Sequence, residues 1–113
     1  MKIIEDKINL QELQEMAEKI FGDLVKAVVD VEKKVMAVDA ELHADLEALL
    51  LEKGSAQKNL WGINIYPKQA GEEFVEFDSM INIRPSQGNR SRGVEDIETQ
   101  KKILQIVNKI VSK

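Results

Sequence analysis

Residues 78–96, which read DSMINIRPSQGNRSRGVED, combine an alternating segment with a polar loop, and our interpretation of the fold starts from them. In INIRP at 81–85 apolar and polar residues alternate, as in a strand with one buried face, and Pro85 ends the strand because proline has no N–H to donate. INIYP at 63–67 repeats this design. We therefore expect two adjacent antiparallel strands, the first spanning 60–66, which bury their Ile side chains on one core. Their outer faces would carry Asn64, Tyr66, Asp78, Met80, Asn82 and Arg84.

Two helices flank the strands. Asn9 is a good N-cap, Glu12 follows three residues later as in a capping box, and apolar residues then recur at helical spacing, which predicts a helix over Leu10–Phe21. Asp96 can cap a second helix over Ile97–Val111, and Lys109 lies near its C-terminal end, where the helix dipole favours positive charge.

A hairpin is expected after the first helix. Leu24–Val31 is rich in Val and Ala and predicts a buried strand, and the polar residues 32–34 then allow Val35 onward to fold back as the second arm.

The segment 35–51 fits two structures. Its even positions are apolar, and its odd positions from Asp39 to Glu47 are polar, which favours a long strand through about Glu47. The Ala, Leu and Glu content instead favours a helix over 43–53, with Leu42, Leu46, Leu49 and Leu50 on one face. We expect the strand, because strict alternation over ten residues rarely arises by accident.

These elements form an α+β domain: an antiparallel sheet of four to five strands with the N-terminal and C-terminal helices packed on it, most simply on one face. A chain of 113 residues has room for one core, which predicts a single domain over 1–113.

Composition excludes several classes of function. The chain has no cysteine, so disulfides, thiolate nucleophiles and cysteine zinc sites are absent. Its net charge of −4 disfavours bulk nucleic-acid binding, and it has neither a signal-peptide core nor an apolar segment long enough to span a membrane. We expect a cytoplasmic protein without a membrane partner.

The loop after Pro85 is the strongest candidate site. Its arginines can bind carboxylate or phosphate in bidentate fashion, Gly88 and Gly93 let the backbone approach a ligand, and the following helix start offers free N–H groups. This predicts a binding site for an anionic group that resembles a phosphate or nucleotide. The candidate ligand-binding residues are Asn82, Arg84, Ser86, Gln87, Asn89, Arg90, Ser91 and Arg92.

Two observations oppose this interpretation. Glu95 and Asp96 lie at the same helix start and would compete for its donors, and the loop matches no phosphate-loop or dinucleotide fingerprint. The alternative is that the same Arg, Ser and Asn side chains satisfy the loop's own backbone or form a subunit contact.

A second candidate site lies on the alternating stretch, where Asp39, Glu41, His43, Asp45 and Glu47 would share one strand face. Carboxylates suit Mg²⁺ or Mn²⁺, and His43 could join them around a transition metal. This would suit a metal-dependent hydrolase with His43, Asp45 and Glu41 as ligands. A solvated strand face explains the same pattern with fewer assumptions.

Whether the protein is an enzyme stays open. Nucleophilic catalysis has little support, because there is no cysteine, no GxSxG motif and only one histidine. A third hypothesis is a homodimeric structural or partner-binding module that uses an exposed sheet face or edge.

Three stretches, ELHADLEALLLEKGS, LWGINIYP and EFDSMINIRPSQGNRSRGVED, give the chain a family resemblance. It resembles a small family of uncharacterised bacterial and archaeal proteins known as a domain of unknown function, from Phe21 through the final helix. The resemblance implies no activity, cofactor or catalytic residue.

Overall fold

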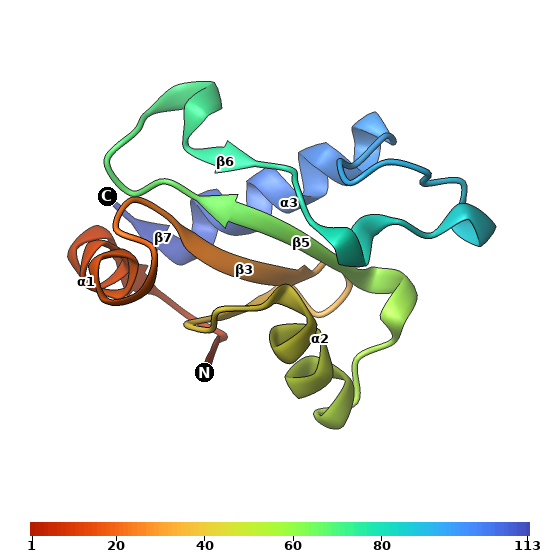
Figure 1. Ribbon diagram of the computed structural model, residues 1–113, viewed down its shortest axis with the longest axis horizontal. Helices are drawn as coiled ribbons and strands as arrows, with labels where there is room; N and C mark the ends of the chain where they lie inside the picture. Colours follow the sequence, from red (N-terminus) through yellow and green to blue (C-terminus); the bar gives the residue numbers. More distant parts are fainter.

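The computed structural model describes residues 1–113, and its central element is an antiparallel sheet of five strands in the order β1-β4-β3-β5-β6 (Figure 1). The strands are β1 Lys2–Ile4, β3 Val25–Asp30, β4 Val35–Val38, β5 Leu60–Ile65 and β6 Val75–Glu76. The central strand, β3, pairs with β4 on one side and along its whole length with β5 on the other. The predicted α+β class and antiparallel sheet are confirmed.

A second, smaller sheet joins two segments near the ends of the chain. Strand β2 (Ile8–Asn9) pairs in parallel with β7 (Val111–Ser112), so the start of the first helix is tied to the end of the last.

Three α-helices accompany the sheet: α1 Leu10–Ile20, α2 His43–Glu52 and α3 Ile97–Ile110. Four short 3-10 turns complete the structure: η1 Gln57–Asn59, η2 Gly71–Glu73, η3 Met80–Asn82 and η4 Pro85–Gln87. The predicted helix caps are present, since Asn9 Oδ1 accepts from the Glu12 amide at 2.8 Å and Asp96 Oδ2 accepts from the Thr99 amide at 3.0 Å. None of the helices has the length and apolar content needed to cross a membrane.

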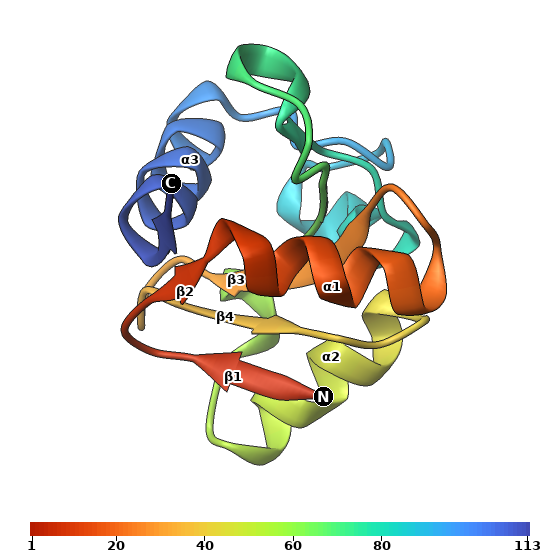
Figure 2. The same cartoon turned by 90° about the vertical axis from the view of Figure 1, so that its left-hand side faces the viewer.

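The helices divide between the two faces of the sheet (Figure 2). Helices α1 and α3 share one face, where they enclose a core of 20 buried residues that includes Leu13, Ala27, Val29 and Ile103. Helix α2 covers the other face with a core of only five: Val28, Ala37, Leu46, Leu50 and Leu60. The α2 side is therefore the thinner layer of the molecule.

The predicted long strand through Glu47 is wrong. Strand β4 ends at Val38, Asp39 adopts a left-handed φ of 74°, and α2 begins at His43. The even positions that suggested alternation include Ala44 and Ala48, which are exposed on the helix. Alanine tolerates exposure and has the highest helix propensity, so it mimicked a buried strand face in the sequence.

The predicted strand at 81–85 is also wrong. Met80–Asn82 form η3, whose start is capped by Ser79 Oγ accepting from the Ile81 amide at 3.3 Å. The actual neighbour of β5 on this side is β6, which pairs Asn64 with Glu76. INIYP and INIRP therefore share a pattern without sharing a structure.

Candidate functional site

Arg84 braces the loop against the strand β5. Its Nη2 donates to the Leu60 carbonyl at 2.7 Å, its Nη1 donates to the Gln57 carbonyl, and its guanidinium lies 4.3 Å from the Trp61 ring centroid. Partial burial lowers the Arg84 pKa, while the nearby Glu47 carboxylate acts in the opposite direction. Only its Nε, which is buried, lacks a partner. Most of the binding capacity predicted for Arg84 is thus used within the chain.

Asn82 and Asn89 are buried and fully engaged with the backbone. Asn82 Nδ2 donates to the carbonyls of Gly62 and Arg92, both at 2.9 Å, and its Oδ1 accepts from the Gly62 amide at 2.8 Å. Asn89 Nδ2 donates to the carbonyls of Asn82 and Gly93, both at 2.8 Å, and its Oδ1 accepts from the Glu95 amide at 2.9 Å. Both side chains hold the loop in shape, and neither presents a free group to a ligand.

Two further residues of the predicted site also have internal partners. Arg92 Nε donates to Asp78 Oδ1 at 2.6 Å, and Gln87 Nε2 donates to the Lys58 carbonyl at 3.2 Å. The Arg92–Asp78 ion pair is largely exposed, so it restrains the loop more than it stabilises the fold.

The backbone amides of the loop that could bind an anion already donate to a carboxylate of the chain itself. Glu95 Oε2 accepts from the amides of Arg90 and Ser91 at 2.7 and 2.8 Å, and these hydrogen bonds lower the Glu95 pKa. Asp96 is engaged in capping α3. Among the predicted ligand residues, only the side chains of Ser86 and Arg90 are exposed and make no hydrogen bond. The loop residues are brought together, but mainly to satisfy one another.

The carboxylate and histidine side chains that were predicted to share one strand face are separated, because this segment forms α2. His43 is buried at the helix start, where its Nε2 donates to the Ile63 carbonyl at 2.8 Å, whereas Glu41 and Asp45 are exposed. Burial is the main cause that lowers the His43 pKa, so the ring is neutral near pH 7, with Nδ1 free of hydrogen bonds. No group of three or more His, Asp or Glu side chains is placed to hold a metal ion. The metal hypothesis assumed that these residues share one strand face, and this assumption is wrong.

A close junction at Gly62 was not predicted from the sequence. A Cβ at this position would lie 2.5 Å from Ser79 Cβ and 3.2 Å from His43 Cδ2. Glycine therefore lets the start of η3 and the start of α2 meet over β5. A glycine inside a strand is the signal that could have revealed this approach.

The start of α2 and the start of η3 thus lie side by side. We term the exposed apolar residues on and next to these two elements the α2–η3 surface: Leu42, Ala44, Ala48, Leu51, Met80 and Ile83. Four of these are large, and they make up half of the eight large apolar side chains that the chain exposes. Ile81, which lies between Met80 and Ile83 in the sequence, packs against the small core that contains Leu46. The surface therefore continues the core that α2 covers.

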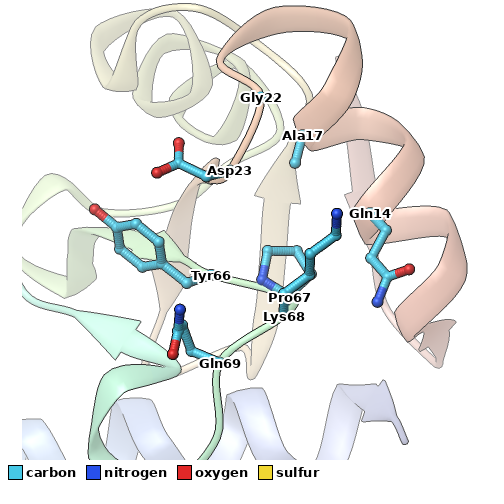
Figure 3. A pocket seen from close by; sticks show the side chains of 8 residues that line it. All are labelled: Gln14, Ala17, Gly22, Asp23, Tyr66, Pro67, Lys68 and Gln69. Atoms are coloured by element: carbon cyan, nitrogen blue, oxygen red, sulfur yellow. The ribbon is translucent and has the colours of Figure 1, made fainter.

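A cavity of about 260 Å³ opens between α1 and the turn that follows β5 (Figure 3). Asp23 and the Tyr66 ring lie on one side of it, and Lys68 and Gln14 lie on the other. Its lining comes from segments far apart in the chain, so no local motif in the sequence could have pointed to it.

Comparison with known proteins identifies the family of the chain and gives no activity. The model of a family described as protein of unknown function (DUF5674) matches residues 2–110. No curated protein and no solved structure matches the chain. The family description names no activity, so function must be argued from geometry. Because the match covers nearly all of its length, the chain belongs to the DUF5674 family of proteins of unknown function.

Proposed function

We propose that the protein is a homodimeric module whose two subunits meet through the α2–η3 surface. The observation that carries this proposal is the exposure of large apolar side chains there, with Met80 at 66 % and Leu42 at 56 %. Neighbouring apolar side chains left in water mark interaction sites, because covering them gains about 25 cal/mol per Å² of buried apolar area.

The exposed face of α2 is suited to a second copy of itself. Ala44, Ala48 and Leu51 follow one another at spacings of four and three residues, so they lie along one side of the helix. The two alanines allow a partner helix to approach closely, and Leu51 adds apolar contact. A two-fold axis places the same patch on both subunits, as in most homodimers.

The charges at the ends of α2 favour an antiparallel pair. Glu41 and Asp45 lie at its N-terminal end, and Lys53 lies at its C-terminal end together with Lys33, whose Nζ donates to the Lys53 carbonyl at 3.3 Å. In an antiparallel arrangement the acidic end of each helix faces the partner's two lysines. Glu52 at the same end and Glu5, which lines one hollow with Lys33 and Lys53, offset part of this positive charge.

Self-association through the sheet, which the sequence suggested, has less support. The edge strands β1 and β6 have three and two residues, so they offer few free backbone groups for pairing. The sheet faces are covered by helices on both sides.

The two other hypotheses also have less support than self-association. An anion at the loop would have to displace Glu95 and would meet only Ser86 and Arg90 as free side chains. A metal-dependent hydrolase would need His43, Glu41 and Asp45 to converge, and α2 separates the buried ring from the exposed carboxylates.

Light scattering coupled to gel filtration tests the proposal. We expect the wild-type protein to elute with twice the mass of one chain at micromolar concentration, and Met80→Lys to shift it to the monomer mass. Ile97→Lys is the matched control, because Ile97 is 64 % exposed and lies outside the surface, at the start of α3. Either a monomeric wild type or equal dissociation by Ile97→Lys would reject the proposed interface.

A charge-swap pair tests the antiparallel arrangement. Lys53→Glu should weaken the dimer, and adding Asp45→Lys should restore it, because each substituted residue would then face its opposite charge across the two-fold axis. If the double variant dissociates further than the single one, the helices do not meet in this orientation.

A further inference from the structure

The cavity of Figure 3 carries opposite charges on its two sides. Asp23 contributes a carboxylate beside Tyr66, and Lys68 contributes an ammonium group on the facing side, next to Gln14. Neither residue forms a salt bridge with the other or with any other residue of the chain. The two charges are therefore held apart with space between them.

We propose that this cavity binds a free α-amino acid. The ligand's carboxylate lies toward Lys68 and the amide of Gln14, and its ammonium group lies toward Asp23. The ring of Tyr66, together with Pro67 and Ala17, contributes the apolar part of the lining.

The size of the cavity favours a small ligand. Its volume of about 260 Å³ lies below the roughly 300–1,000 Å³ typical of sites for drug-sized molecules. A zwitterion of a few heavy atoms fits this space, whereas a nucleotide does not. The cavity also contains residues with amide side chains, Gln14 and Gln69, which can both donate and accept hydrogen bonds.

The electrostatics on the Tyr66 side select a positive group. The Tyr66 hydroxyl donates to Glu76 Oε1 at 3.1 Å, and the carboxylates of Glu76, Asp23 and Asp78 add to burial in raising the Tyr66 pKa. A phosphate or a dicarboxylate would meet these negative charges with Lys68 as its only cationic partner in the cavity. A ligand with one positive and one negative group matches both sides.

Ligand-induced thermal stabilisation tests the proposal, with L-alanine as the first probe and the other proteinogenic amino acids after it. Propionate and ethylamine serve as matched controls, because each keeps only one of the two charged groups of alanine. We expect at least one amino acid to raise the melting temperature while neither control does. If no amino acid raises it, or if propionate or ethylamine does so equally, the proposal fails.

Two variants then locate the site. Lys68→Gln and Asp23→Asn should each weaken binding of the stabilising amino acid by about tenfold or more, the value of a charge-assisted hydrogen bond. The exposed residues Lys7 and Asp6 provide the controls Lys7→Gln and Asp6→Asn, which should bind as the wild type does. Equal losses in the control variants would overturn the assignment.

Amide chemical shifts give a readout that does not depend on stability. Titration should move the backbone signals of Gly22, Asp23 and Gln69, which surround the cavity, before those of the loop at 84–93. Shifts confined to any other part of the molecule would place the ligand elsewhere and refute this site.

Discussion

Asn82 pairs with both backbone groups of Gly62: its Nδ2 donates to the Gly62 carbonyl at 2.9 Å, and its Oδ1 accepts from the Gly62 amide at 2.8 Å. One side chain thus takes the place that a neighbouring strand would occupy beside β5. The third contact, to the Arg92 carbonyl, joins this pairing to the loop. The polar stretch around residues 78–96 is therefore a structural extension of the sheet.

We expect Asn82→Ala to lower the free energy of unfolding by about 3 kcal/mol, because it leaves buried backbone groups without partners. Urea denaturation measures the loss. Asn108→Ala, at an exposed position on α3, should change it by less than about 0.5 kcal/mol. A loss at Asn82 as small as that at Asn108 would mean that water replaces the Asn82 contacts.

We expect Gly62→Ala to destabilise the fold by about 1–3 kcal/mol or more, because the added methyl group would overlap Ser79 Cβ at 2.5 Å. Ser79→Gly removes the atoms in the way. The double variant should therefore lose less unfolding free energy than the sum of the two single losses. Unfolding free energies of the wild type, both single variants and the double variant complete the cycle. Strict additivity would show that the clash is relieved by movement elsewhere.

The terminal helices could be predicted because their signals are local. Asn9 and Asp96 each accept from an amide three residues later, and apolar residues recur on one side of each helix. Such patterns depend on neighbours within one or two turns, which the sequence displays directly.

The segments at 35–51 and 81–85 could not be predicted because contacts distant in the sequence decide them. Leu46 and Leu50 become helical core residues only because the sheet presents Val28 and Ala37 to them. Ile81-Asn82-Ile83 leaves the sheet because Asn82 finds its partners at Gly62, twenty residues earlier. The loop residues stand out in the sequence, but their chemistry does not distinguish internal hydrogen bonds from ligand binding.

The contacts of Arg84 with β5 and with the Trp61 ring can be tested by spectroscopy. We expect Arg84→Lys to cost about 1–2 kcal/mol of unfolding free energy, because lysine cannot reach two carbonyls and stack on the ring with one planar group. Trp61 is the only tryptophan, so the tryptophan fluorescence of the protein reports the surroundings of this one ring. An unchanged emission spectrum together with unchanged stability would show that Arg84 does not hold the loop against β5. Arg90→Lys, at an exposed position, is the control.

Glu95 allows the role of the loop to be tested by chemical rescue. Glu95→Ala removes the carboxylate that accepts from the amides of Arg90 and Ser91, and the variant should melt at a lower temperature than the wild type. Added phosphate should recover part of that loss in the variant and leave the wild type unchanged. Glu98→Ala, in the first turn of α3, should show no rescue. Stabilisation of the wild type by phosphate would instead favour an anion site in the intact loop.

His43 should make stability depend on pH just below neutrality. Burial holds its folded-state pKa below the ordinary value of 6.5, so the unfolded chain binds the proton more readily than the folded one. Stability that is fully present above pH 6.5 is therefore lost as the pH falls toward the folded-state pKa. His43→Gln can still donate to the Ile63 carbonyl but does not titrate, so its unfolding free energy should stay level between pH 7.5 and 5.5 while that of the wild type declines. Glu95 and Asp96, whose pKa values are also lowered, titrate at more acidic pH. They therefore do not contribute to the pH dependence of stability between pH 7.5 and 5.5. Parallel pH profiles of wild type and variant would show that the ring titrates as it does in the unfolded chain.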